Sequence, residues 1–156
     1  MKSFAGKIAV ITGGGSGIGR ELALQLASIG CDVAMCDVFA ETMAETKRLC
    51  LSQARQGTRV ATFVADVSIE DQVLAFADAV RRDLDTDHIH LLFNNAGIGG
   101  GGGFVDGSRA EWEKTFGVCW NGVYYCTRAF LPLLQKANEG HIVNTSSVNG
   151  FWASLG

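Results

Sequence analysis

The sequence has little charge, almost no proline and no long apolar run. Only 19% of its 156 residues are charged and one is proline, against 20 glycines and 47% hydrophobic residues. This balance favours a compact α/β domain and excludes a disordered or collagen-like chain. The net charge of -3 excludes the basic surface that nucleic-acid binding requires. Near the start, the apolar run "IAVI" is too short for a signal peptide or a membrane span. We expect a cytoplasmic protein without nucleic-acid or membrane partners.

Metal-binding and disulfide patterns are also missing. The five cysteines are an odd number and contain no C-x-x-C pair. We therefore expect small buried hydrophobic residues in a reducing compartment. His88 and His90 flank one expected strand and His141 begins another, and the H-E-x-x-H pattern is absent. The sequence predicts no metal site.

Short runs rich in Val, Ile and Leu alternate with longer segments of helical period. The expected strands are residues 7–12, 31–37, 59–66, 90–97 and 141–147. The expected helices are residues 19–30, a segment through about Gln56, residues 69–83 and a long segment from about 109 to 136. Ser68 with Asp71, and Ser108 with Glu111, predict capping boxes at two helix starts. The alternation predicts an α/β fold with a doubly wound parallel sheet, covered on both faces.

The segment "TGGGSGIG" (Thr12–Gly19) joins the first strand to the first helix. Glycines let the backbone turn sharply and approach a pyrophosphate, and the helix start offers N–H groups and a positive dipole end. The spacing Gly13-x-x-x-Gly17-x-Gly19 differs from the general G-x-G-x-x-G pattern. The alternative is a tight turn with incidental glycines, which the position and density of the glycines disfavour. The predicted cofactor contacts here are Gly13, Gly15, Ser16, Gly17, Ile18 and Gly19.

Asp37 ends the second expected strand, eighteen residues after Gly19. In a doubly wound sheet a carboxylate at this place can accept hydrogen bonds from both hydroxyls of an adenosine ribose. It would also repel a 2′-phosphate, and neighbouring Ser16 and Val38 supply no cation to reverse that preference. Asp37 therefore predicts NAD rather than NADP, with a solvated loop aspartate as the alternative.

Five motifs in order resemble the short-chain dehydrogenase/reductases: Thr12–Gly19, Asp66-Val67, "NNAG" (94–97), Asn121 and "IVNTSS" before Val148. The resemblance implies a single NAD-binding Rossmann domain over residues 1–156 with five of the family's strands. It also implies hydride transfer between a nicotinamide cofactor and a small-molecule alcohol or ketone.

The family's site residues are carried over by position. Asp66 and Val67 are similar to its adenine-contacting pair, and Asn94, Ala96 and Gly97 to the backbone segment that lies along the cofactor and supports the sheet centre.

On the catalytic side, Asn121 is similar to the asparagine that holds a water in the proton relay, and Ser147 to the catalytic serine. Taken alone, Asn121 could instead be a helix-interior amide and Ser147 a strand-end cap. Asn149, Phe151 and Trp152 would border the substrate pocket.

The family's mechanism also needs a tyrosine with a lysine four residues later. The only tyrosines, Tyr124 and Tyr125, are followed at that distance by Arg128 and Ala129. We interpret both tyrosines as core or subunit-contact residues. An apolar fifth strand at the sheet edge would also leave unpaired backbone groups. We expect the chain to be the N-terminal portion of a longer dehydrogenase, truncated at its C-terminal side.

Three functions compete. The first is an NAD-dependent oxidoreductase, and the second is a non-catalytic dinucleotide-binding relative. The third is an epimerase or dehydratase on the same fold, which the glycine spacing disfavours. The family resemblance also implies a homodimer or homotetramer built on the long helix, where Val118, Tyr125 and Phe130 are candidate contacts. Ordinary core packing is the alternative for these three.

Overall fold

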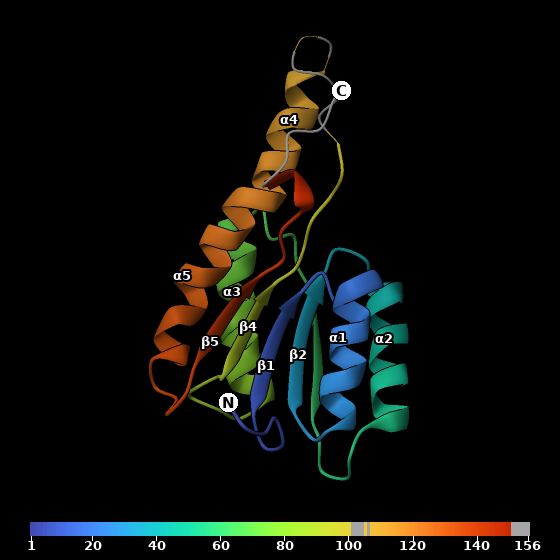
Figure 1. Ribbon diagram of the computed structural model, residues 1–156, viewed down its shortest axis with the longest axis vertical. Helices are drawn as coiled ribbons and strands as arrows, with labels where there is room; N and C mark the ends of the chain where they lie inside the picture. Colours follow the sequence, from blue (N-terminus) through green and yellow to red (C-terminus); the bar gives the residue numbers. More distant parts are fainter. Residues whose placement is uncertain (101–104, 106, 151–156) are drawn as a thin grey trace.

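Five parallel strands form one sheet in the order β3-β2-β1-β4-β5 (Figure 1). The computed structural model describes residues 1–100, 105 and 107–150. The strands are β1 (Ile8–Thr12), β2 (Asp32–Asp37), β3 (Val60–Val64), β4 (Leu91–Asn94) and β5 (His141–Asn144). Chain order reverses between β1 and β4, and ligands of open parallel sheets bind beyond the carboxyl ends of the strands at such a switch point. The predicted doubly wound α/β sheet is confirmed.

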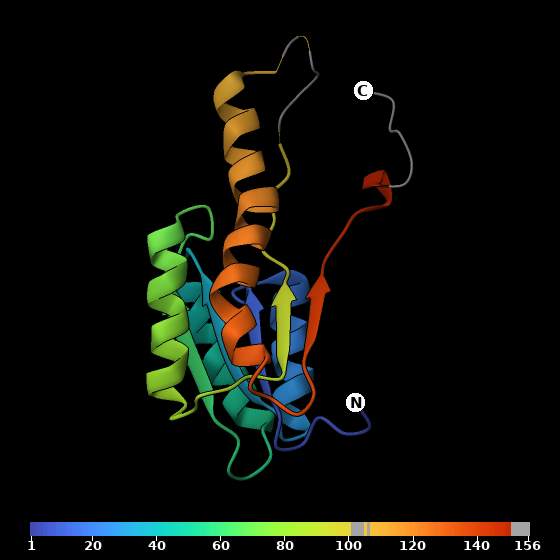
Figure 2. The same ribbon diagram turned by 90° about the vertical axis from the view of Figure 1, so that its left-hand side faces the viewer.

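Helices cover both faces of the sheet. Helices α1 (Gly17–Ser28) and α2 (Ala40–Gln53) lie on one face, and α3 (Glu70–Asp83), α4 (Arg109–Phe116) and α5 (Gly122–Leu134) belong to the other side (Figure 1). The predicted long helix is helical throughout, but a π-helical turn, Gly117–Asn121, separates α4 from α5. Figure 2 shows this continuous helical segment with its α5 part beside α3 and its α4 part extending beyond the sheet.

One of the two predicted serine caps is present. The Glu111 N–H donates to Ser108 Oγ at 3.2 Å, so Ser108 caps α4 as predicted. The prediction for Ser68 is wrong, because α3 follows Ile69 and has no side-chain cap bond. The Ser68 hydroxyl and N–H both donate to Asp66 Oδ1, at 2.7 and 2.9 Å. The nearby carboxylate therefore draws Ser68 into a local turn instead.

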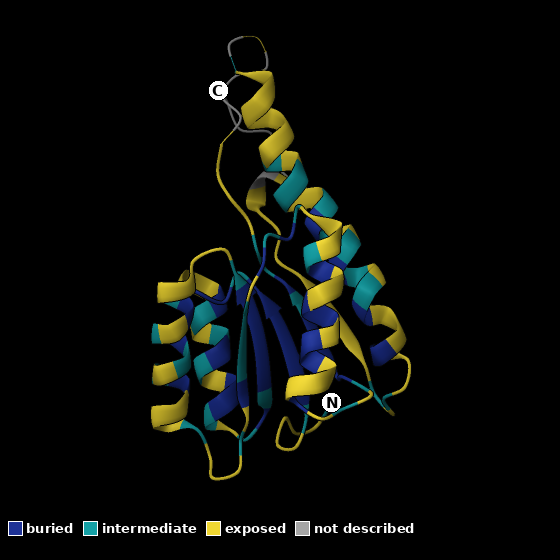
Figure 3. Cartoon of the chain, turned by 180° about the vertical axis from the view of Figure 1, so that it is seen from behind, coloured by how far each residue is buried: buried dark blue, intermediate teal, exposed yellow. Residues whose placement is uncertain are grey.

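An apolar core lies on each side of the sheet. Figure 3 shows buried strands in the middle of the sheet, between helices that are each partly buried and partly exposed. Under α3 and α5, Phe76 and Phe130 meet edge to face at 5.4 Å, and both side chains are almost completely buried. Phe130 is therefore a core residue, and its candidacy as a subunit contact is wrong. Val118 and Tyr125 are partly buried against the same core.

Four of the five cysteines are buried as expected: Cys31, Cys36, Cys50 and Cys126. Burial above all, and then the charge of Asp32, raise the pKa of the Cys31 thiol to about 12, while a hydrogen bond with the Ala9 backbone acts in the opposite direction. Burial alone raises the pKa of the Cys126 thiol to about 12. The expectation is wrong for Cys119, which lies in the π turn and is exposed; its thiol donates to the Ile98 carbonyl at 3.5 Å.

Neither a metal centre nor a membrane span is found in the part of the chain that the structure describes. No three His, Cys, Asp or Glu side chains are grouped so that they could hold an ion there. The helices within those residues are each too short or too polar to cross a bilayer.

His90 precedes β4 and is hydrogen-bonded to Ile8, the first residue of β1. Its side chain is buried, and Nδ1 accepts a hydrogen bond from the Ile8 N–H at 3.1 Å. Burial above all, and then the positive charges of Lys7 and His88, lower the pKa of His90, while Glu139 acts weakly in the opposite direction. The folded protein therefore holds His90 as a neutral acceptor.

This pKa shift predicts a pH-dependent stability. The unfolded chain takes up a proton at an ordinary histidine pKa of about 6.5, and the folded chain only at lower pH. The free energy of unfolding should be highest above pH 6.5 and fall as the pH decreases below it. In His90→Asn, an amide oxygen can accept the Ile8 N–H but does not titrate, so the decrease between pH 7.5 and 5.5 should be smaller. Urea unfolding of both proteins across this range measures it. An equal decrease in the variant would assign the effect to other groups.

Candidate functional site

Two adjoining hollows of about 410 and 260 Å³ form one groove beyond the carboxyl ends of β1, β2 and β4. Nine of the predicted cofactor residues line it: Gly13, Ser16, Gly17, Ile18, Asp37, Asp66, Val67, Ala96 and Gly97. Loops that are far apart in the sequence are thus brought to one edge of the sheet. This is the switch point at which the fold class places ligands.

The glycine turn at the groove has two residues in the left-handed backbone region, Gly13 at φ +69° and Gly17 at φ +52°. Its return into α1 is very tight, because a Cβ on Gly19 would lie 2.0 Å from the Gly13 carbonyl oxygen. Helix α1 begins at Gly17, directly after the turn. A helix start presents unpaired N–H groups and a positive dipole end, so this turn is suited to a phosphate.

Asp37 ends β2 beside this turn with a fixed carboxylate. Its Oδ2 accepts a hydrogen bond from the Gly15 N–H at 3.0 Å, and its Oδ1 accepts from the Val38 N–H at 2.8 Å. The side chain is half-buried. Oδ1 also accepts a hydrogen bond from the Phe39 N–H at 3.4 Å, so Oδ2 is the oxygen that retains a lone pair for a further donor, such as a ribose hydroxyl.

Asp66 and Val67 form the opposite wall after β3. The Asp66 N–H donates to Gln72 Oε1 at 2.8 Å, and its carboxylate holds Ser68. Val67 is buried against Gly122 of α5, where a Cβ would lie 2.7 Å from Val67 Cγ2. A glycine at this position lets the helix approach the wall closely.

Asn94 is predicted to belong to the backbone segment that lies along the cofactor and supports the sheet centre, and it is not among the described residues that line the groove. It is almost completely buried, and its Nδ2 donates to Asn144 Oδ1 at 2.8 Å and to Thr127 Oγ1 at 3.1 Å. These bonds join β4 to β5 and to α5. The structure thus gives the Asn94 side chain a supporting position.

Asn95 was missed by the sequence analysis and links three strands at the groove. Its Nδ2 donates to the Thr12 carbonyl, and its Oδ1 accepts from Thr145 Oγ1, both at 3.1 Å. The Thr12 hydroxyl accepts from the N–H groups of Asn95 and Ala96 at 3.0 Å each. The available signal was a polar residue at the end of each of three expected strands.

Lys114 of α4 and Cys36 of β2 also line the groove without having been predicted as site residues. Lys114 brings a positive charge to a wall that contains Asp37 and Asp66. No local sequence motif predicts that Lys114 lies at this site. Burial first, then nearby Cys126 and Asp37, raise the pKa of the Cys36 thiol well above its usual range. Cys36 is therefore a neutral wall residue and not a nucleophile.

The two predicted catalytic residues lie on different elements, one at the end of the π turn and the other beyond β5. Asn121 is half-buried and ends the π turn, a rare helical form that is frequent at functional sites. Ser147 is exposed beyond β5, and its carbonyl accepts from the Gly150 N–H at 2.9 Å. Neither residue is among the described residues that line the groove. Phe151, Trp152 and the side chain of Asn149 lie outside the described part.

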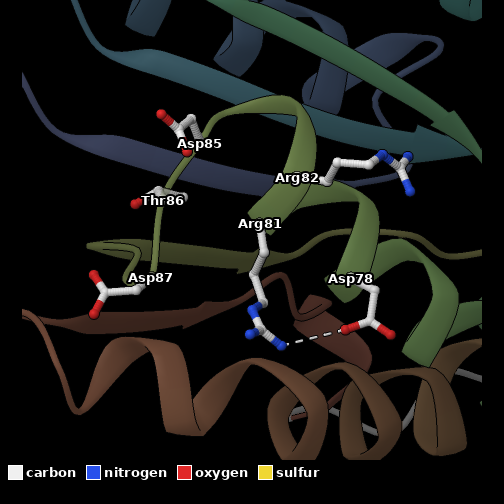
Figure 4. A pocket seen from close by; sticks show the side chains of 6 residues that line it. All are labelled: Asp78, Arg81, Arg82, Asp85, Thr86 and Asp87. Atoms are coloured by element: carbon white, nitrogen blue, oxygen red, sulfur yellow. Dashed lines mark hydrogen bonds and ion pairs between the residues drawn. The ribbon is translucent and has the colours of Figure 1, made fainter.

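A second hollow of about 560 Å³ lies at the carboxyl end of α3, near the opposite edge of the sheet (Figure 4). It is bordered by Asp78, Arg81, Arg82, Asp85, Thr86 and Asp87. Opposite charges neutralise one another there, as in the ion pair between Arg81 and Asp78 at 3.4 Å. This hollow has no glycine turn, so the carboxyl-end groove is the better candidate site.

The family model described as short chain dehydrogenase matches residues 7–156. The SadH protein of Mycobacterium tuberculosis is 43% identical over 156 residues, covering all of this chain and 55% of SadH. The chain spans about half the length of the curated relatives it matches.

Solved structures match just as well. A short chain dehydrogenase/reductase from Burkholderia phymatum, in complex with NAD, is 41% identical with a TM-score of 0.90, covering 99% of this chain and 53% of that one. A metagenomic short-chain oxidoreductase in complex with NADP is 33% identical with a TM-score of 0.84, covering 96% and 66%. Relatives of this fold thus hold either dinucleotide.

The tight return at Gly19 predicts a stability effect. In Gly19→Ala, the new Cβ would press on the Gly13 carbonyl and on Asn95 Nδ2, which lies 2.7 Å away. Overpacking of this kind costs about 1–3 kcal/mol. Contact with rigid backbone should place it near the upper limit, outweighing the ~1 kcal/mol that alanine gains over glycine in a helix.

Gly99→Ala is the matched control, because a Cβ there meets no atom within 4 Å. Its free energy of unfolding should change by less than about 0.5 kcal/mol. Urea unfolding compares the variants. Equal stability of Gly19→Ala and Gly99→Ala would mean that the turn can relax around a side chain.

Proposed function

The chain belongs to the short chain dehydrogenase family, and from this premise we propose that it is the NAD-binding domain of an oxidoreductase. The reaction is the interconversion of a small-molecule alcohol and a carbonyl compound by hydride transfer. The observation that carries the choice of cofactor is the Asp37 carboxylate, held next to the glycine turn by the Gly15 and Val38 N–H groups.

In this proposal a dinucleotide lies along the groove. The glycine turn and the start of α1 would hold the pyrophosphate, and Asp37 would accept bonds from the adenosine ribose hydroxyls. Asp66 and Val67 would border the adenine. A Cβ on Gly15 would lie 2.9 Å from Asp37 Oδ2 and 2.5 Å from Thr42 Oγ1, so the backbone lies in direct contact with the ribose-binding carboxylate.

The preference for NAD rests on charge. A 2′-phosphate would carry its negative charge to Asp37, and Ser16 and Val38 provide no cation beside it. The cation in the groove wall is Lys114, which belongs to a different element. We therefore assign NAD as the cofactor, although the fold itself accepts both dinucleotides in relatives.

A bound nicotinamide would accept hydride from the alcohol or deliver it to the carbonyl. In this proposal Ser147 donates a hydrogen bond to the substrate oxygen, and Asn121 positions a water in the path of the proton. The printed sequence contains no Tyr-x-x-x-Lys pair. Tyr124 does not replace it, because its Oη accepts a hydrogen bond from Arg128 at 3.0 Å on the exposed side of α5.

The second candidate is a dinucleotide-binding protein without turnover, because neither Asn121 nor Ser147 is among the described residues that line the groove. The 156 residues are predicted to be inactive without a Tyr-x-x-x-Lys pair, so the two are separated on the full-length gene product, by measuring NADH formation from NAD⁺ with panels of primary and secondary alcohols alongside NAD⁺ binding by calorimetry. Binding together with NADH formation supports the oxidoreductase. Binding without NADH formation supports the second candidate, and absence of both contradicts the proposed site.

A homo-oligomer is also part of the proposal, on different residues from those predicted. Trp112, Phe116 and Trp120 form an exposed row on α4 and the π turn, with ring centroids 5.2 and 5.9 Å apart. An apolar row of this kind on a helix that extends beyond the sheet suits a contact with a second copy.

Trp120→Glu should lower the apparent mass in sedimentation, because a charge would enter this contact. Leu74→Glu, at an exposed position of α3, should leave the mass unchanged. An unchanged mass in Trp120→Glu contradicts this contact.

The role of Asp37 predicts a change of cofactor preference. Asp37→Ala removes a charged acceptor of ribose hydroxyl bonds, worth about 1.5–3 kcal/mol each, so NAD⁺ affinity should fall about tenfold or more. NADP⁺ affinity should stay the same or rise, because the repulsion of its 2′-phosphate is lost. Calorimetric titration with both dinucleotides gives the ratio.

The control for Asp37→Ala is Asp78→Asn, an exposed carboxylate remote from the groove. Both affinities should remain as in the wild type. A parallel loss of NAD⁺ and NADP⁺ affinity in Asp37→Ala would show that Asp37 supports the turn without discriminating between the cofactors.

A further inference from the structure

Gly15 is held on its carbonyl side by two residues that are outside the predicted site. The Gly15 carbonyl accepts a hydrogen bond from Arg20 Nη2 at 2.6 Å and another from Thr46 Oγ1 at 3.3 Å. Arg20 Nε donates to the same Thr46 hydroxyl at 2.9 Å. Thr46, on α2, is completely buried, and Arg20, in the first turns of α1, is partly buried. The three groups form a closed triangle.

On its other side, Gly15 contacts the ribose-binding carboxylate. Its N–H donates to Asp37 Oδ2 at 3.0 Å. Because the N–H and the carbonyl of Gly15 belong to the two peptide planes that flank it, bonds to both restrict its φ and ψ together. The triangle of Gly15, Arg20 and Thr46 therefore sets the direction in which the Gly15 N–H meets Asp37.

We propose that Arg20 and Thr46 are positioning residues that determine cofactor preference by holding Gly15 against Asp37. This inference rests on the proposed function, in which Asp37 binds the ribose of NAD. A carboxylate held in place accepts the ribose hydroxyls without first losing conformational freedom, and such preorganisation improves affinity. It also cannot turn away from a 2′-phosphate, so the same rigidity maintains the repulsion of NADP.

A purely structural role for the triangle has a different consequence. Both dinucleotides carry the same pyrophosphate and would use the same glycine turn. If Arg20 and Thr46 only stabilised this turn, their loss would weaken NAD⁺ and NADP⁺ alike. The ratio of the two affinities therefore separates a role in preference from a role in folding.

Two substitutions open the triangle in different ways. Arg20→Met removes the guanidinium while keeping an unbranched apolar stem. Thr46→Val is nearly isosteric, keeps the Arg20 charge and removes only the shared hydroxyl, so it separates geometry from electrostatics. Thr46→Ser restores a hydroxyl. Arg48→Met is the control for loss of an arginine, because Arg48 lies on exposed α2 and pairs with Glu45 at 2.8 Å.

The test is calorimetric titration of the chain and these four variants with NAD⁺ and with NADP⁺, after urea unfolding has shown that each variant is folded. Loss of one hydrogen bond to a charged group corresponds to about a tenfold change in affinity. The NAD⁺ to NADP⁺ affinity ratio should fall about tenfold in Arg20→Met and Thr46→Val. It should stay within about threefold of the wild type in Thr46→Ser and Arg48→Met.

An unchanged ratio in Arg20→Met and Thr46→Val, with NAD⁺ still bound by the wild type, would overturn this inference and leave the proposed function intact. A wild type that binds neither dinucleotide would overturn both. If one of the two substitutions prevents folding, the ratio in the other decides. A changed ratio in Thr46→Val together with rescue in Thr46→Ser supports the positioning role.

Discussion

The contact between the Gly13 carbonyl and Gly19 is the constraint on which the rest of the site depends. It leaves no room for a side chain, and α1 begins at Gly17 after a short turn from the end of β1, with its first residues lining the groove. The same short connection brings Gly15 next to the end of β2, within hydrogen-bond distance of Asp37. A wider turn would separate the glycine backbone from the Asp37 carboxylate, and the hydrogen bond between Gly15 and Asp37 would be lost.

Polar side chains then align the ends of the strands around this turn. Parallel strands are joined by backbone hydrogen bonds only as far as the sheet extends, and beyond it each loop would be free to move. Asn95 connects Thr12 at the end of β1 to Thr145 after β5, while Asn94 of β4 connects to Asn144 of β5. The segment that leads to Ser147 is thereby tied to the segment that holds the glycine turn.

Local patterns predicted well where neighbours in sequence decide the outcome, and less well where distant groups compete. Ser108 caps its helix because, among the described residues, its side chain bonds with Glu111 alone. Ser68 has the same spacing to Asp71, but the carboxylate of Asp66 takes its hydroxyl and N–H. The long helix was predicted in extent, yet the π turn that ends at Asn121 has no signal in the apolar periodicity. Cys119 lies in this π turn, and its exposure has no signal in the apolar periodicity either.

The sequence by itself determined the alternation of strands and helices, the glycine turn, Asp37 at a strand end and the family resemblance. These features depend on residue type and on short spacings along the chain. Only the tertiary structure decided that Arg20 and Thr46 hold Gly15, that Asn95 spans three strands, and that Phe130 lies inside the core. Such contacts join residues from different elements, and the packing of helices on the sheet decides which of many polar side chains meet.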